Sequence, residues 1–77
     1  MNKARRDRIS KVISELEALR AECENLRDEE QEAFDAMPEG LQQGERGQAS
    51  ENAISELESA ISSIESAEGE LDNSKGE

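Results

Sequence analysis

Carboxylates are the groups in this 77-residue chain that could most readily do chemistry, and they crowd its middle. Between residues 28 and 51 there are eight acidic side chains and a single basic one, Arg46. Like charges at this density oppose folding unless solvent, cations or a basic partner offset them. We therefore interpret the segment as a partner-binding site for a basic protein. Its chief members are Glu29, Glu30, Glu32, Asp35 and Glu39.

Glu30 also continues, at steps of seven, a row formed by Ile9, Leu16 and Cys23. A carboxylate in that apolar row could face Arg46 across a turn, point at a partner, or mark a splayed end of a helix pair. No metal site and no cofactor are expected. The acids lack the alternating ligands and central Gly of a calcium loop, and the chain has no His and no second Cys for zinc.

Catalysis finds little support in the residue types. The chain contains no His, Tyr or Trp, and its one thiol, Cys23, lies in an apolar row where a core role is expected. Plentiful carboxylates on solvated helix faces normally serve solubility. We therefore expect a protein that is not an enzyme.

Basic side chains gather at the start of the chain. Residues 1–11 hold five basic and one acidic side chain, a net charge of +4, and the rest holds four basic and nineteen acidic ones, a net charge of −15. The basic cluster could bind the phosphates of a nucleotide ligand, or it could pair with acids near the C-terminus when the chain folds back, which we favour. The candidate phosphate ligands are Arg5, Arg6, Arg8 and Arg46, and the candidate pairing acids are Glu65, Glu68, Glu70 and Asp72. Nucleic acid is disfavoured as a partner, because the net charge of −11 repels phosphates and the single aromatic residue offers little stacking.

Two helices must position these groups. Apolar residues recur at alternating steps of three and four in two stretches, a spacing that places them on one helix face. Pro38 and the nearby glycines separate the stretches. The sequence predicts one all-α domain over residues 1–77, an antiparallel, coiled-coil-like helical hairpin. We expect a first helix over about 3–36, a turn over about 37–44, a second helix over about 45–72 and a frayed tail over 73–77.

We also expect self-association. Hydrophobic residues make up 32% of the chain, and two helices cover each other's apolar row from one side only. A dimer or higher oligomer, most simply a four-helix bundle, would bury both rows. The residues assigned to the shared seam are Ile9, Val12, Leu16, Leu19, Leu26, Ile54, Leu57, Ile61 and Ile64. Ala53, Ala60 and Ala67 form a further row. It is either a surface that another helix can approach closely, or it reflects only the high helix propensity of alanine.

The expected cellular compartment follows from segments that the sequence lacks. No apolar run is long enough to span a membrane, and no hydrophobic stretch follows the basic start as it would in a signal peptide. A single Cys also fits a reducing compartment. We expect a cytoplasmic protein.

The segment over about residues 29–47 resembles the middle of a group of small, acidic, mostly uncharacterised helical proteins from bacteriophages, prophages and bacterial mobile elements. The similar stretches are Glu29-Glu30-Gln31-Glu32-Ala33-Phe34-Asp35, Met37-Pro38-Glu39, Leu41-Gln42 and Glu45-Arg46-Gly47. Gly40 and Gly44 stand where we would expect Ser. The resemblance implies a phage accessory protein with no established chemistry, acting in the cytoplasm of the host cell.

Three functions remain open. The protein could bind and inhibit or regulate a basic host protein, such as a defence-system or nucleic-acid-binding protein. It could instead be a sponge that sequesters a cyclic-nucleotide immune signal, or a structural coiled-coil module. The strong negative charge favours the first, and the absence of Trp and Tyr counts against the sponge.

Overall fold

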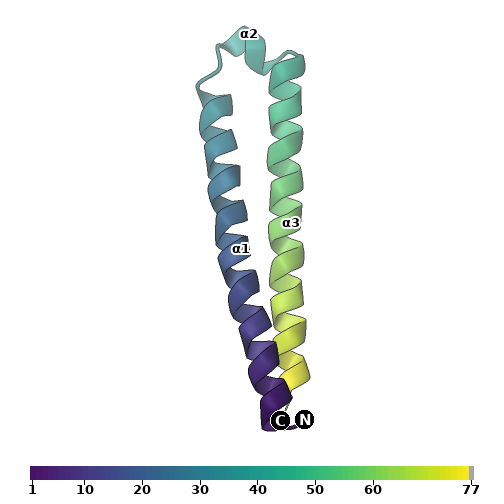
Figure 1. The fold of residues 1–77 in the computed structure, drawn as a ribbon. Helices are drawn as coiled ribbons and strands as arrows, with labels where there is room; N and C mark the ends of the chain where they lie inside the picture. The colour runs from purple at the N-terminus through teal and green to yellow at the C-terminus, as the bar shows by residue number, and fades with distance from the viewer. Residues whose placement is uncertain (77) are drawn as a thin grey trace.

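The computed structural model describes residues 1–76, which form helices and contain no strand. The helices are α1 (Lys3–Asp35), α2 (Glu39–Gln42) and α3 (Glu45–Lys75). Helices α1 and α3 run antiparallel side by side, α2 bridges them at one end, and both termini lie at the other end (Figure 1). The molecule is a rod of 58 × 14 × 13 Å. The predicted all-α helical hairpin is confirmed.

Local signals explain where α1 begins and ends. The Asn2 side chain caps its start, since Oδ1 accepts a hydrogen bond from the Arg5 N–H at 2.8 Å. No Gly or Pro interrupts the helix, and it ends before Pro38, which disfavours helical geometry at the preceding residue.

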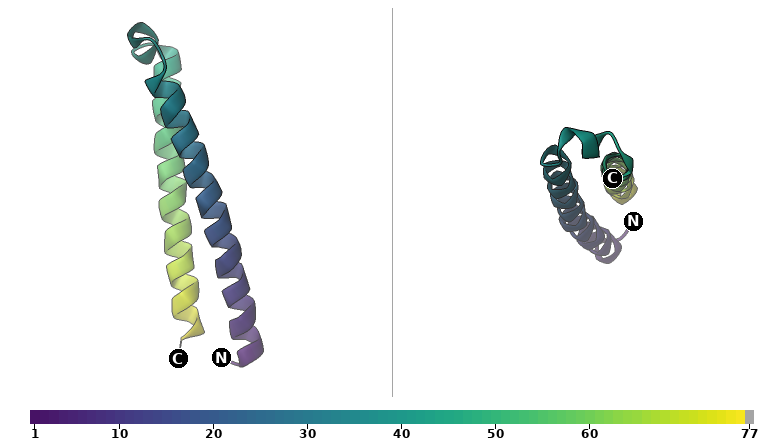
Figure 2. Two further views of the ribbon diagram at one scale, coloured as in Figure 1. Left: turned by 90° about the vertical axis from the view of Figure 1, so that its left-hand side faces the viewer. Right: turned by 90° about the horizontal axis from the view of Figure 1, so that it is seen from above.

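The turn expected over about residues 37–44 contains a short helix, α2. Pro38, with φ of −55°, stands at the N-terminal cap of α2, and its carbonyl accepts hydrogen bonds from Leu41 and Gln42 at 2.9 and 3.1 Å. Figure 2 shows α2 lying across the top of the two long helices. The turn is therefore a folded element of its own.

The end of α3 also differs from the expected boundary near residue 72. Residues 73–75 are helical, and the helix ends at Gly76, whose φ of 71° is a left-handed conformation suited to glycine. Lys75 holds this last turn, because its Nζ lies 3.4 Å from Asp72 Oδ1 and donates to Ser10 Oγ of α1 at 3.2 Å. Residue 77 of the expected frayed tail lies outside the described residues.

The hairpin seam, our name for the face between α1 and α3, follows a heptad repeat. Its α1 positions are Ile9, Ile13, Leu16, Arg20, Cys23, Arg27, Glu30 and Phe34, and its α3 positions are Gly47, Ser50, Ile54, Leu57, Ile61, Ile64, Glu68 and Leu71. All are buried or half-buried, and Ile61, at 6% exposed, is the one large hydrophobic side chain among residues 1–76 that is buried rather than half-buried. The two helices cross at a shallow angle, as such packing requires (Figure 2).

Three residues assigned to the shared seam from sequence lie outside the hairpin seam of the single chain. Val12, Leu19 and Leu26 are 43%, 58% and 44% exposed within the single chain. The neighbouring positions, Ile13, Arg20 and Arg27, take their place against α3. The reason is geometric: α1 carries three candidate columns, and one neighbouring helix covers only two. The third column is left on the surface.

Candidate functional site

The turn is held by a close backbone approach at Gly47. This residue is buried in the first turn of α3, and a Cβ there would overlap the carbonyl group of Gln42 and lie 2.6 Å from its Cα. No side chain fits in that space. The sequence suggested only flexible backbone at Gly47, whereas the structure requires glycine there because α2 packs directly on α3.

Gln42 ties the same point to α1. Its Nε2 donates a hydrogen bond at 3.0 Å to the carbonyl of Phe34, in the last turn of α1. The same carbonyl also accepts a hydrogen bond from the Met37 N–H at 3.1 Å, so the Gln42 side chain is its second partner at the end of the helix. One residue thus joins all three helices: its backbone meets Gly47 and its side chain caps α1.

Glu30 lies inside the hairpin seam and faces Ser50. The Ser50 side chain, in a residue only 4% exposed, donates through Oγ to Glu30 Oε2 at 2.6 Å. A short hydrogen bond to a carboxylate is among the stronger polar contacts in a protein. Of the interpretations left open, the structure thus gives neither a bridge to Arg46 nor a free carboxylate. Ser50 was missed, although it stands in heptad phase with Ile54 and could have been found from that spacing.

The other four predicted binding acids are exposed at the turn end of the rod. We call Glu29, Glu32, Asp35 and Glu39 the acidic turn surface. Asp35 accepts a hydrogen bond from the Gln31 side chain at 3.0 Å. Arg46 is exposed and forms no ion pair among residues 1–76. The surface therefore carries dense negative charge that this part of the chain does not neutralise.

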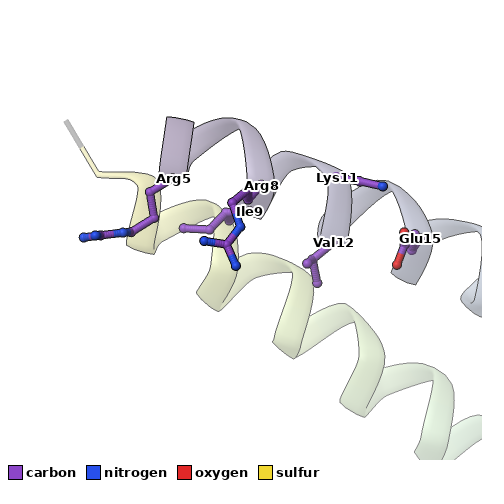
Figure 3. Close-up of a pocket in the computed structure, with 6 residues that line it drawn as sticks. All are labelled: Arg5, Arg8, Ile9, Lys11, Val12 and Glu15. Atoms are coloured by element: carbon purple, nitrogen blue, oxygen red, sulfur yellow. The ribbon is translucent and has the colours of Figure 1, made fainter. Parts of the chain in front are cut away.

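The four predicted phosphate-binding arginines do not converge. Arg5, Arg8, Lys11 and the acidic Glu15 rim an open hollow on α1 whose floor is Ile9 and Val12 (Figure 3). Nearby, Arg6 turns away and donates to the Met1 carbonyl at 2.7 Å. Arg46 stands at the opposite end of the hairpin, at the start of α3 (Figure 1).

The expected charge pairing at the open end is wrong. Among residues 1–76, no basic side chain of positions 3–11 forms an ion pair with α3, and Lys3 pairs instead with Asp7 at 2.8 Å. Arg5, Arg8 and Lys11 occupy heptad columns of α1 that turn away from α3, which explains the outcome.

Arg20 makes the ion pair between the helices. Its Nε and Nη2 donate to the two carboxylate oxygens of Glu68 at 2.8 and 3.3 Å, and Nη1 lies 3.9 Å from Glu65 and 3.6 Å from Glu24. The Glu68 side chain is 13% exposed, so the pair is partly desolvated. The hydrogen bond to Glu68, followed by the nearby carboxylate charges, raises the pKa of Arg20. The guanidinium therefore stays charged at every pH at which the protein would be studied.

In residues 1–76, no three His, Cys, Asp or Glu side chains are grouped as a metal ion would need. No helix of that range combines the length and the apolar character required to cross a membrane. The chain matches no family model, no curated protein and no solved structure.

Proposed function

We propose that this protein is a non-enzymatic binding protein that presents the acidic turn surface to a basic region of another protein. The observation that carries the proposal is the close packing within the turn. Contacts at Gly47, Gln42 and Ser50 hold it from within, while the carboxylates stand on the outside. A preorganised surface loses little conformational entropy on binding, so its contacts contribute more to affinity.

Charge defines the partner. Carboxylates lose water favourably only where cationic groups replace it, so the partner must offer Lys or Arg side chains. A surface of this kind presents negative charge where a nucleic-acid-binding protein would expect phosphates. For a phage accessory protein acting in the host cytoplasm, that partner is a defence-system or nucleic-acid-binding protein of the host, which the interaction inhibits or regulates.

A charge-reversal capture experiment tests the proposal. The wild-type chain, the E32K/E39K variant and the control E17K/E58K are used as bait in a host lysate at about 0.1 M salt, a condition in which exposed charges act over about 10 Å. The control changes the charge by the same amount at exposed positions midway along the rod. We expect wild type and control to retain the same basic protein and the turn variant to lose it.

Binding of the purified partner then gives the quantitative result. Reversal of the turn charges should slow association and reduce its salt dependence, since steering acts mainly on the on-rate. Equal affinity of the turn variant and wild type would contradict the proposal.

A second candidate function, a sponge for a cyclic nucleotide, is supported by the hollow rimmed by Arg5, Arg8 and Lys11. Phosphates would lie against these cations. Titration with cyclic dinucleotides should then give binding that R5E/R8E abolishes and E32K/E39K leaves intact. The net charge of −11 disfavours this candidate. A purely structural coiled-coil module would show neither activity.

A further inference from the structure

The two long faces of the hairpin differ sharply in chemistry. Each heptad of the hairpin seam has two seam residues, and the residue directly before the first of them lies beside the seam. In an antiparallel helix pair, these flanking residues of both helices lie on the same side of the hairpin. The middle of that side is formed by Val12, Leu19, Leu26, Ala53, Ala60 and Ala67, which we call the apolar face, and Arg5 and Arg46 occupy the same columns at its two ends. The other side carries Ser10, Glu17, Glu24, Gln31, Glu51, Glu58, Glu65 and Asp72. The charged side is well solvated, whereas the apolar face would gain free energy from being buried.

The chain exposes more surface than a compact monomer of its mass. A compact monomer of this mass exposes roughly 4,650 Å² by the usual size scaling, whereas this chain exposes 5502 Å². The excess, roughly 850 Å², equals about what one partner contributes to a standard protein interface. Beyond its two seam columns, one of which contains Arg20 and Arg27, α1 carries the column Val12, Leu19 and Leu26, and an apolar column outside the seam is typical of a helix in a bundle rather than in an isolated pair.

We propose that the apolar face is the contact between two copies of this chain, packed face to face with their rods antiparallel. The charge distribution selects this direction. The turn segment, residues 28–51, holds eight acids and one base, whereas residues 1–11 carry a net charge of +4. Rods packed in the same direction would set the two acidic turns together, and antiparallel rods set each turn beside the basic start of the other copy.

In this arrangement, side chains of the second copy fit into the hollow on α1. A two-fold axis near Leu19 pairs the level of Val12 with that of Leu26 in the second copy. Leu26 of the second copy then covers the apolar floor at Ile9 and Val12, and its Glu29 reaches the rim formed by Arg5 and Arg8. The same contacts repeat on the other side of the axis.

Disulfide trapping tests both the face and the direction. In a Cys23→Ser background, V12C and L26C are oxidised separately and then as a mixture. We expect efficient cross-linking only in the mixture, because position 12 faces position 26 of the other copy. The control E17C, on the charged face, should not cross-link with either. Efficient V12C self-linking, or linking of L26C to A53C, would overturn the antiparallel arrangement.

Mass measurement tests the contact without any substitution. Light scattering at micromolar concentration should give twice the 8.5 kDa of the chain. Leu19→Asp should halve that mass, and Ser14→Asp, an exposed position on another side of α1, should leave it unchanged. A monomeric wild type would overturn the proposal. These measurements need no partner protein, so their outcome is independent of the proposed function.

Discussion

At the scale of single residues, Gly47 shows that a glycine can be required for space alone. It lies within α3, and Gly76 is the one described residue with a positive φ, so no unusual backbone angle demands glycine at position 47. What demands it is the backbone of Gln42, which occupies the place of a Cβ. Local propensity would favour Ala at the same position, since glycine weakens a helix.

A pair of substitutions separates these two effects. Gly47→Ala should destabilise the protein by about 1–3 kcal/mol, because overpacking forces α2 away from α3. Gly69→Ala is the matched control, since Gly69 is also within α3 and a Cβ there meets nothing within 4 Å. It should stabilise by about 0.5–1 kcal/mol through helix propensity. Urea unfolding measures both changes, and a gain in stability from both substitutions would contradict the close packing.

Arg20 yields a prediction about ion pairs. Arg20→Met should lower the melting temperature more than Lys3→Met, because Arg20 bridges two helices and Lys3 pairs only with Asp7 in its own exposed turn. Since the pKa of Arg20 is raised, the stability that its protonation adds is complete below the pKa of arginine in the unfolded chain and is lost as pH rises from there through the raised value. Between pH 5 and 9, Arg20 itself should therefore add no slope to stability. Equal melting temperatures for the two variants would show that the Arg20 pair is not stabilising.

At the scale of elements, the sequence determines the two helices but not their rotation about their own axes. Steps of three and four with no internal Pro suffice to predict α1 and α3, and Pro38 places the break. Hydrophobicity alone would choose Leu19 over Arg20 to face α3. The structure chooses Arg20, because its long stem can pack in the seam while the guanidinium reaches Glu68.

The acidic turn surface and Glu30 were partly predictable from their positions in the helical repeat. Exposed Glu32 and Asp35 follow from their helical position, and the heptad phase of Glu30 already indicated the seam. The roles of Gly47 and Gln42 depend on where α2 packs, which is a tertiary relation that no local pattern in the chain encodes.

At the scale of the whole molecule, the antiparallel pairing would make a rod with an acidic turn at each end. Each hairpin is 58 Å long, so the two turns would lie far apart, and their acids other than Glu29 could engage two sites at once. Two linked contacts strengthen binding without any new chemistry, provided the partner offers basic regions at a matching distance.

A charge swap tests this assembly through the pairing of Arg8 with Glu29 of the second copy. Exposed ion pairs contribute about 0.2–1 kcal/mol each, and the two-fold axis creates two of them, so Arg8→Glu should weaken the dimer roughly 2- to 30-fold in analytical ultracentrifugation. Adding Glu29→Arg should restore wild-type affinity, because the attraction returns with its signs exchanged. Glu70→Arg serves as the comparison, since Glu70 would meet Arg8 only if both turns lay at the same end. Rescue by Glu70→Arg and not by Glu29→Arg would show that the two rods point in the same direction. The two acidic turns would then lie together at one end of the dimer.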